Sequence, residues 1–117
     1  MQNYKKLLVW EKSFLLIEHV YRCTENLPRS EEFGLKQQMR RAAVSIPSNI
    51  AEGSSRRSKR DFQRFLEISL GSAFELETLI EICRKLNFLS TDEASQLVEQ
   101  IAGIRKMIYS LSKKLET

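Results

Sequence analysis

The side chains with the clearest chemical potential lie in one basic stretch of the sequence. Residues 36–64 carry eight Lys and Arg side chains against two acids, a net charge of +6, although the whole chain of 117 residues carries only +4. Lysine and arginine bind phosphate groups, and their contacts with a nucleic-acid backbone release counterions. The stretch therefore predicts an anion-binding surface. Its candidate nucleic-acid-binding residues are Arg40, Arg41, Arg56, Arg57, Lys59, Arg60 and Arg64.

Two of these cations occupy an unusual position. Lys59 and Arg60 would lie in the first turn of a helix, where the helix dipole disfavours positive charge. Free N–H groups at that helix start, with the hydroxyls of Ser54, Ser55 and Ser58, would complete an anion site. No motif for reading bases accompanies it, so binding would be mostly electrostatic. A solvated charged loop is the alternative interpretation.

The inventory of reactive residues argues against catalysis. The only histidine, His19, has Leu16 three positions before it, so the Glu-x-x-His spacing of di-iron bundles is absent. The nucleophile motif Gly-x-Ser-x-Gly and the phosphate-binding P-loop are absent as well. One histidine and two cysteines are too few for a Cys/His zinc site, which needs about four ligands. We therefore predict no catalytic residue, no metal and no cofactor, in a protein that is not an enzyme.

The cysteines and the apolar segments indicate the compartment. Cys23 and Cys83 lack the CxxC spacing and fall on apolar faces, which predicts buried free thiols. Near the N-terminus only four apolar residues, 7–10, precede a glutamate, too few for a signal sequence or a membrane span. We expect a cytoplasmic protein without membrane contact.

The elements that must position these residues are helices. Only four glycines and two prolines interrupt the chain, and apolar residues recur at steps of three and four. Breaks near residues 27–30, 53–55 and 87–92 divide this pattern into four segments, and short connections make neighbouring helices antiparallel. The sequence predicts an all-α fold, an antiparallel up-down-up-down four-helix bundle forming one domain over residues 1–117. The expected helices span about 7–26, 31–52, 59–86 and 92–114.

Several residues carry more specific structural predictions. Ser58 and Ser90 each precede an acid by three positions, as in the capping box, and Gly53 is a candidate C′ glycine. Pro47 lies inside the second helix, where its ring predicts a kink. A polar motif of Ser45, Asn49, Glu52 and Gly53 runs beside the apolar seam, and it either fixes register and assembly or faces solvent.

Two apolar residues of the third segment do not fit its buried face. Phe74 and Ile82 project toward the polar side of the expected helix, where a monomer gains nothing from them. We interpret them as candidates for a subunit interface. Scattered apolar residues are also normal on protein surfaces, which is the alternative.

The segment 45–53, reading Ser-Ile-Pro-Ser-Asn-Ile-Ala-Glu-Gly, resembles a known family. This is the four-helix bundle family encoded within intervening sequences of bacterial 23S rRNA genes. The resemblance implies a ring-like homopentamer, similar to the basic accessory protein of diversity-generating retroelements, which is thought to bind nucleic acid and a reverse transcriptase. It implies no catalytic residue and no cofactor. Further matching segments are Leu8-Val9-Trp10, Leu27-Pro28, Glu32 to Leu35, Gln38, Arg40 to Ala43, Phe62 to Leu66 and Gly71 to Leu76.

Together these features predict a non-enzymatic, oligomeric bundle that binds structured RNA or DNA through the basic stretch. The alternative is a protein-interaction scaffold whose basic face meets an acidic partner protein. Residues 65–83 carry a net charge of −4, so that partner could be another copy of the chain.

Overall fold

The computed structural model describes residues 3–116, apart from the side chain of Lys6, so positions 1, 2 and 117 of the expected domain lie outside the described residues. Four α-helices account for most of this range, and no strand occurs within it. The prediction of an all-α four-helix bundle is confirmed. The helices are α1 (Leu8–Thr24), α2 (Leu35–Ser54), α3 (Lys59–Lys85) and α4 (Thr91–Lys114), with 3-10 turns at Tyr4–Lys6 and Arg29–Glu31.

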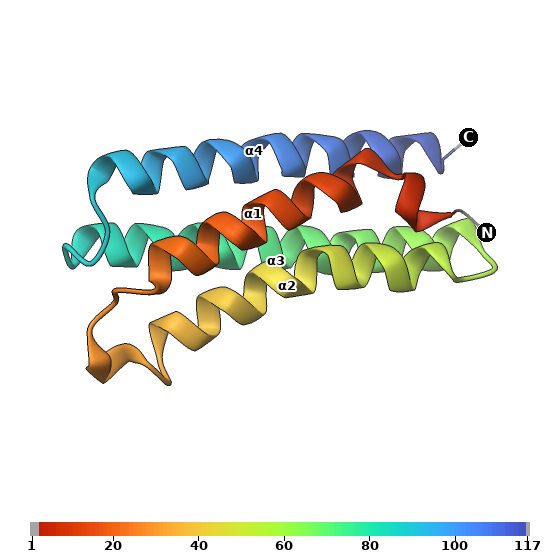
Figure 1. The fold of residues 1–117 in the computed structure, drawn as a ribbon. Helices are drawn as coiled ribbons and strands as arrows, with labels where there is room; N and C mark the ends of the chain where they lie inside the picture. The colour runs from red at the N-terminus through yellow and green to blue at the C-terminus, as the bar shows by residue number, and fades with distance from the viewer. Residues whose placement is uncertain (1–2, 117) are drawn as a thin grey trace.

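The helices lie side by side along a body of 45 × 24 × 19 Å (Figure 1). The chain reverses direction at each connection, and α1 contacts both α2 and α4. The most extensive interface joins α2 to α3. As a result, the α2–α3 connection lies at the same end as the start of α1 and the end of α4 (Figure 1).

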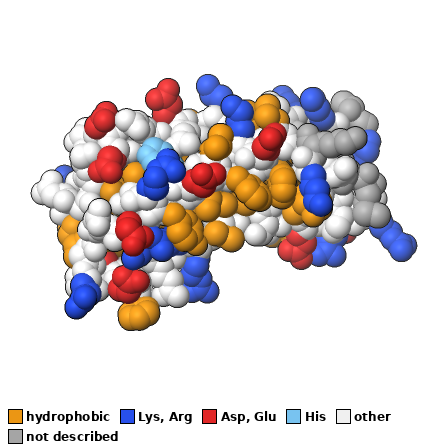
Figure 2. Space-filling model, in the orientation of Figure 1, with side chains coloured by type: hydrophobic (Ala, Val, Ile, Leu, Met, Phe, Trp, Pro, Cys, Tyr) orange, Lys and Arg blue, Asp and Glu red, His pale blue; other side chains and the backbone are white. Residues whose placement is uncertain are grey.

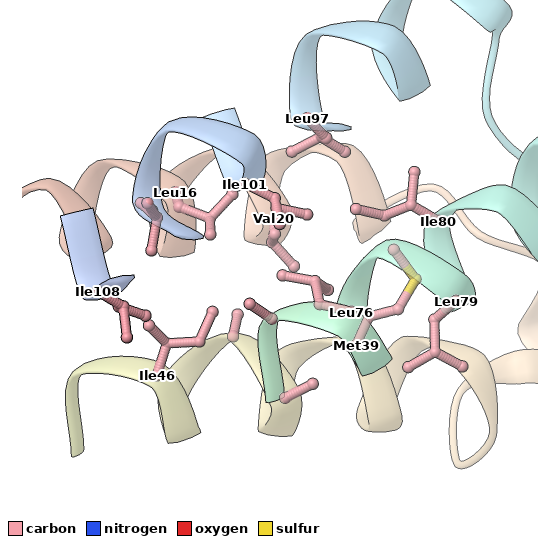
Figure 3. Close-up of a cluster of buried hydrophobic side chains, with 14 of the residues drawn as sticks. Leu16, Val20, Met39, Ile46, Leu76, Leu79, Ile80, Leu97, Ile101 and Ile108 are labelled. Carbon is pink, nitrogen blue, oxygen red and sulfur yellow. The ribbon is translucent and has the colours of Figure 1, made fainter. Parts of the chain in front are cut away.

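A continuous apolar core fills the space between the helices. Every helix contributes fully buried side chains, which meet at the centre of the bundle (Figure 3). Burying one such side chain stabilises the fold by about 1.5–3 kcal/mol. The apolar seam of α3 is buried over its whole length, from Phe62 to Cys83, and its polar member Ser69 donates its hydroxyl to the Ile46 carbonyl at 2.9 Å. Labelled core residues in Figure 3 include Leu16, Val20, Met39, Ile46, Leu76, Ile80, Leu97, Ile101 and Ile108.

Polar side chains end the helices largely as predicted. The Ser90 hydroxyl accepts the amide of Glu93 at 3.1 Å, and the Glu93 carboxylate accepts the amide of Ser90 at 3.4 Å, which completes a capping box for α4. Ser58 caps α3 by accepting the amide of Asp61 at 3.1 Å. Both serines are confirmed as N-caps.

The second helix differs from its prediction at both ends. It begins at Leu35 rather than near residue 31, because residues 29–31 form a 3-10 turn and the Glu31 carboxylate accepts the amide of Leu35 at 3.2 Å. It also continues past residue 52, to Ser54. The kink at Pro47 stays a prediction, although Pro47 does lie inside the helix.

Gly53 is not the predicted C′ glycine. It lies inside α2, and none of the described glycines has a positive φ. A Cβ at this position would lie 2.6 Å from the Cβ of Phe65 and 3.0 Å from Cδ1 of Phe62. The glycine is therefore needed because α3 approaches the backbone of α2 closely, and not because the chain turns there.

Part of the polar motif bridges α2 and α3. The Asn49 amide donates to the Ser45 carbonyl at 2.8 Å and to the Ser45 hydroxyl at 2.9 Å. That hydroxyl lies 2.8 Å from the hydroxyl of Ser72 on α3. Ser45 and Asn49 are half-buried, whereas Glu52 is exposed. The motif thus combines an interhelical contact with a solvated end.

Candidate nucleic-acid interface

The α2–α3 connection is held in place by aromatic packing. Phe62 and Phe65, in the first two turns of α3, pack against Gly53. The guanidinium carbons of Arg56 and Arg64 lie 4.7 and 4.9 Å from the centroid of the Phe65 ring. The packing of α3 against α2 therefore also positions cations around the Phe65 ring. We call the five cations here the basic connection: Arg56, Arg57, Lys59, Arg60 and Arg64.

The cations of the basic connection differ in their hydrogen bonds and ion pairs with other residues of the chain. Arg56 donates to the Glu52 carboxylate at 3.0 Å, but both side chains are exposed, and such surface pairs contribute about 0–1 kcal/mol. Arg57 and Arg60 are exposed, and no hydrogen bond or ion pair joins them to another residue in the range 3–116. Their charge is therefore available to an external anion.

The serine hydroxyls contribute less than predicted. Ser54 is 1% exposed and donates to the Ala51 carbonyl at 2.8 Å, while Ser55 donates to the Glu52 carbonyl at 2.6 Å. Each hydroxyl has one hydrogen, so neither serine is left to donate to an anion. The prediction is wrong for these two residues. Ser58 accepts in its cap and keeps its hydroxyl hydrogen.

The fold adds cations that the local sequence pattern did not indicate. The Gln63 amide of α3 donates to the Ser112 carbonyl of α4 at 3.0 Å, so the last turn of α4 lies beside the start of α3. That turn carries Lys113 and Lys114. Lys and Arg side chains gather toward this end of the molecule in Figure 2. Lys113 and Lys114 could have been predicted here from the expected antiparallel bundle, because the fourth helix then ends where the third begins.

Arg40 and Arg41 lie apart from the basic connection, in the first half of α2. Arg41 lies 13 residues, or roughly 20 Å at the α-helical rise, before the end of α2 at Ser54. Arg40 donates to the hydroxyl of Thr24 at 3.0 Å, to the Tyr21 carbonyl at 3.2 Å and to the Glu25 carboxylate at 3.2 Å. It therefore fastens α2 to α1. The structure thus divides the seven predicted binding residues into a group of five and a separate pair.

The candidate interface residues Phe74 and Ile82 differ in their surroundings. Their side chains are 43% and 40% exposed. The guanidinium carbon of Arg105 lies 4.8 Å from the Phe74 ring centroid, and Arg105 also pairs with Glu77 at 3.3 Å, so Phe74 contacts α4 of its own chain. Other large apolar side chains in the described range are exposed as well, above all Phe33 at 87%.

The two thiols are poorly suited to reaction or metal binding. Burial raises the pKa of the Cys23 thiol to about 11, and the neighbouring Glu93 carboxylate adds to the rise. Burial also raises the pKa of the Cys83 thiol, whose sulfur lies 3.5 Å from that of Met39 in the core. No cluster of three His, Cys, Asp or Glu residues arranged to hold a metal occurs within residues 3–116. No helix in that range is long and apolar enough to cross a membrane.

Comparison with known proteins identifies a family model and a similar solved structure. The family model described as "23S rRNA-intervening sequence protein" matches residues 5–110. The crystal structure of a protein with unknown function from the S23 ribosomal protein family of Bacteroides thetaiotaomicron is similar, with a TM-score of 0.81 and 26% sequence identity. The similarity covers 91% of this chain and 99% of that chain. No curated protein matches the chain.

Proposed function

The chain belongs to the 23S rRNA-intervening sequence protein family, and from this membership we propose that it is a non-enzymatic bundle that binds structured RNA or DNA. Binding occurs through phosphate contacts of the basic connection. The observation that carries the proposal is the placement of exposed cations, Lys59 and Arg60, in the first turn of α3, against the helix dipole.

The electrostatics of this helix start favour an external anion. A cation in the first turn of a helix costs about 0.3–1 kcal/mol, and the turn of α3 that carries Lys59 and Arg60 holds one acid, Asp61. Arg57 adds a further charge just before the helix. A phosphate backbone placed here makes the electrostatic energy of this helix start favourable, because the phosphates are attracted both to the cations and to the helix terminus. Polyanion binding would therefore relieve a repulsion built into the fold.

The ligand recognised in this way is a backbone rather than a base sequence. The basic connection offers guanidinium and ammonium groups, with Lys113 and Lys114 extending the charge onto α4. Such groups contact phosphates whatever the bases are, and they fix orientation rather than sequence. We therefore expect affinity that depends steeply on salt and weakly on sequence.

We propose further that the protein acts as a homo-oligomer, a pentamer as the family resemblance implies. The outer face of α3 supports this proposal because Ile68 and Ile82 are 44% and 40% exposed on that helix. Several copies of one modest basic surface bind a long polyanion together through avidity. Light scattering tests the assembly, with Ile82→Glu as the disrupting variant. A monomeric mass for the unaltered protein would contradict it.

A salt series of binding to duplex RNA and DNA tests the proposed function. Replacing Arg56, Arg57, Lys59 and Arg60 with Ala removes up to four phosphate contacts, and each contact contributes about 0.9 to the slope of log K against log salt. We expect a shallower slope and at least a tenfold weaker affinity at moderate salt. The measurement is fluorescence anisotropy with labelled duplexes.

The matched control removes the same charge from the opposite end. Arg22, Arg29, Arg84 and Lys85 are replaced with Ala, and affinity should change little. Equal losses in both variants would show a net-charge effect and no site. Absence of binding at low salt would overturn the proposal, and a protein partner that stays bound after nuclease treatment would support the acidic-partner alternative instead.

A further inference from the structure

A groove of about 510 Å³ lies between α1 and α2, away from the basic connection. Its volume falls within the range of small-ligand sites. Its walls combine two aromatic rings and three cations with one acid, Glu32, two uncharged polar side chains and one aliphatic side chain. The residues that matter are Tyr21, Phe33, Lys36, Arg40, Arg41 and Val44.

Phe33 forms one rim of this groove on a fixed backbone turn. Its side chain is 87% exposed, so packing within the chain does not account for it. The turn is held because the Glu31 carboxylate accepts the amide of Leu35 at 3.2 Å and the Glu31 carbonyl accepts the amide of Gly34 at 3.1 Å. The structure thus presents an aromatic face to solvent at a defined position.

Tyr21 lines the groove from α1, and its ring is already stacked. The Arg40 guanidinium carbon lies 4.2 Å from the Tyr21 ring centroid, while three hydrogen bonds hold the guanidinium to α1 and the residue that follows it. Both groups are planar and fixed before any ligand arrives. Planar, preorganised surfaces of this kind suit a flat aromatic ligand.

The cations of the groove are unequally compensated. Lys36 pairs with Glu32 at 3.2 Å, and Arg40 pairs with Glu25 at 3.2 Å. Arg41 is exposed and makes no hydrogen bond or ion pair with another residue between positions 3 and 116. One uncompensated guanidinium therefore stands beside the two rings. This pairing of aromatic faces with positive charge matches a nucleotide, which has a flat base and an anionic phosphate.

We propose that the α1–α2 groove binds unpaired nucleobases of single-stranded RNA or DNA, with Phe33 and Tyr21 stacking on bases and Arg41 contacting a phosphate. The inference rests on the proposed function and adds a second site to it. Arg41 and Glu52 are eleven residues apart on α2, about three turns, and so lie on nearly the same face. Glu52 pairs with Arg56. A strand leaving a duplex at the basic connection could thus follow this face to the groove.

The test compares ligands that differ in their bases and strandedness. Labelled single strands of RNA and of DNA with one sequence are titrated by anisotropy, alongside a duplex and an abasic single strand of equal length. Phe33→Ala should weaken single-strand binding by about 5- to 150-fold, the equivalent of losing one stacked base. It should leave duplex and abasic binding unchanged. Because Phe33 is exposed, this variant should fold normally.

Two further variants sharpen the result. Phe33→Trp should restore single-strand affinity, and bases stacked on the new indole should quench its fluorescence. Arg41→Ala should weaken single-strand and abasic binding alike, through the lost phosphate contact. The difference between the RNA and DNA arms identifies the preferred sugar.

The outcomes separate this inference from the proposed function. If Phe33→Ala binds both duplexes and single strands as well as the unaltered protein does, the groove is not a binding site. The proposed function of the basic connection is then unaffected. No binding of any nucleic acid overturns both. If Phe33→Ala instead lowers the oligomer mass in light scattering and leaves single-strand affinity intact, the groove serves a second copy and the inference is wrong.

Discussion

The two ends of α3 follow opposite electrostatic rules. At its C-terminal end, Arg84 and Lys85 lie in the last turn, and α4 then begins with Asp92 and Glu93. These signs match the helix dipoles, and the Ser90 capping box and an Arg84–Glu81 pair at 3.2 Å reinforce them. At its N-terminal end, by contrast, α3 begins with cations, and α2 has no basic residue in its last turn.

This contrast separates charges that serve folding from charges that do not. Every charged group named at the α3–α4 end stabilises a helix terminus of the chain itself. Arg57 and Arg60 of the basic connection, by contrast, make no hydrogen bond or ion pair with another residue in the described range, and Arg60 opposes the dipole of its own helix. We relate these two charges to the proposed polyanion. The predictions below test that division from the largest expected effect to the smallest.

The largest effect should come from the close contact that supports the basic connection. Gly53→Ala forces a Cβ to within 2.6 Å of Phe65, and overpacking of this kind costs about 1–3 kcal/mol. The control is Gly71→Ala, where no atom lies within 4 Å of the new Cβ and helix propensity should raise stability by up to about 1 kcal/mol. Urea unfolding measures both. Equal stability of the two variants would show that α2 and α3 do not need this approach.

The helix caps should rank the two ends by local stability. Ser90→Ala removes a reciprocal capping box and should cost about 1–2 kcal/mol, whereas Ser58→Ala removes one cap bond and should cost about 0.5–1 kcal/mol. Thermal or urea unfolding gives the difference. A larger cost at Ser58 would reverse the proposed division of roles.

Charge reversal at the start of α3 should stabilise the protein while harming its binding. Arg60→Glu replaces an unfavourable cation with an acid that suits the dipole, so unfolding free energy should rise by about 0.3–1 kcal/mol at low salt. The gain should shrink at high salt, where the dipole is screened. Arg60→Gln separates loss of a cation from gain of an anion. A destabilised Arg60→Glu protein would indicate that the cation has an internal partner after all.

The smallest effect at neutral pH concerns Cys23, which lies near the start of α4. Its pKa rises from an ordinary value of 9.0 to about 11, chiefly through burial and then through Glu93. Between these values the unfolded chain loses the proton and the folded chain keeps it, so stability should fall as pH rises from 9 toward 11. Cys23→Ala should flatten this part of the profile relative to the unaltered protein. Identical profiles would mean that the thiol titrates alike in both states.

The fold could be predicted from the spacing of apolar residues, because this spacing determines which face of each helix is buried. The seam from Phe62 to Cys83 and the caps at Ser58 and Ser90 follow from spacing within a single segment. The prediction of Gly53 as a C′ glycine is wrong because its constraint comes from Phe65, on the next helix. The residues around Gly53 in the sequence do not indicate how closely α3 approaches.

The candidate site was predictable only where it is local. The five cations of the basic connection are close in sequence and stay close in space. Arg40 was grouped with them by proximity in sequence, but its contacts with Thr24 and Tyr21 depend on how α1 packs against α2. Lys113 lies at the basic end because α4 ends beside the start of α3. Phe33 becomes a candidate binding residue only once the structure shows that its side chain is exposed.

Residues 55–58, which carry Arg56 and Arg57, form the covalent link between two helical hairpins, α1–α2 and α3–α4. Trypsin cleaves after lysine and arginine, so this exposed segment should be the first part of the chain to be cut. Because α2 and α3 share the most extensive interface of the bundle, the two halves should stay together after cleavage. The protein can therefore be divided into complementary fragments at the end that carries the basic connection, and the proposed polyanion would protect that same segment from the protease.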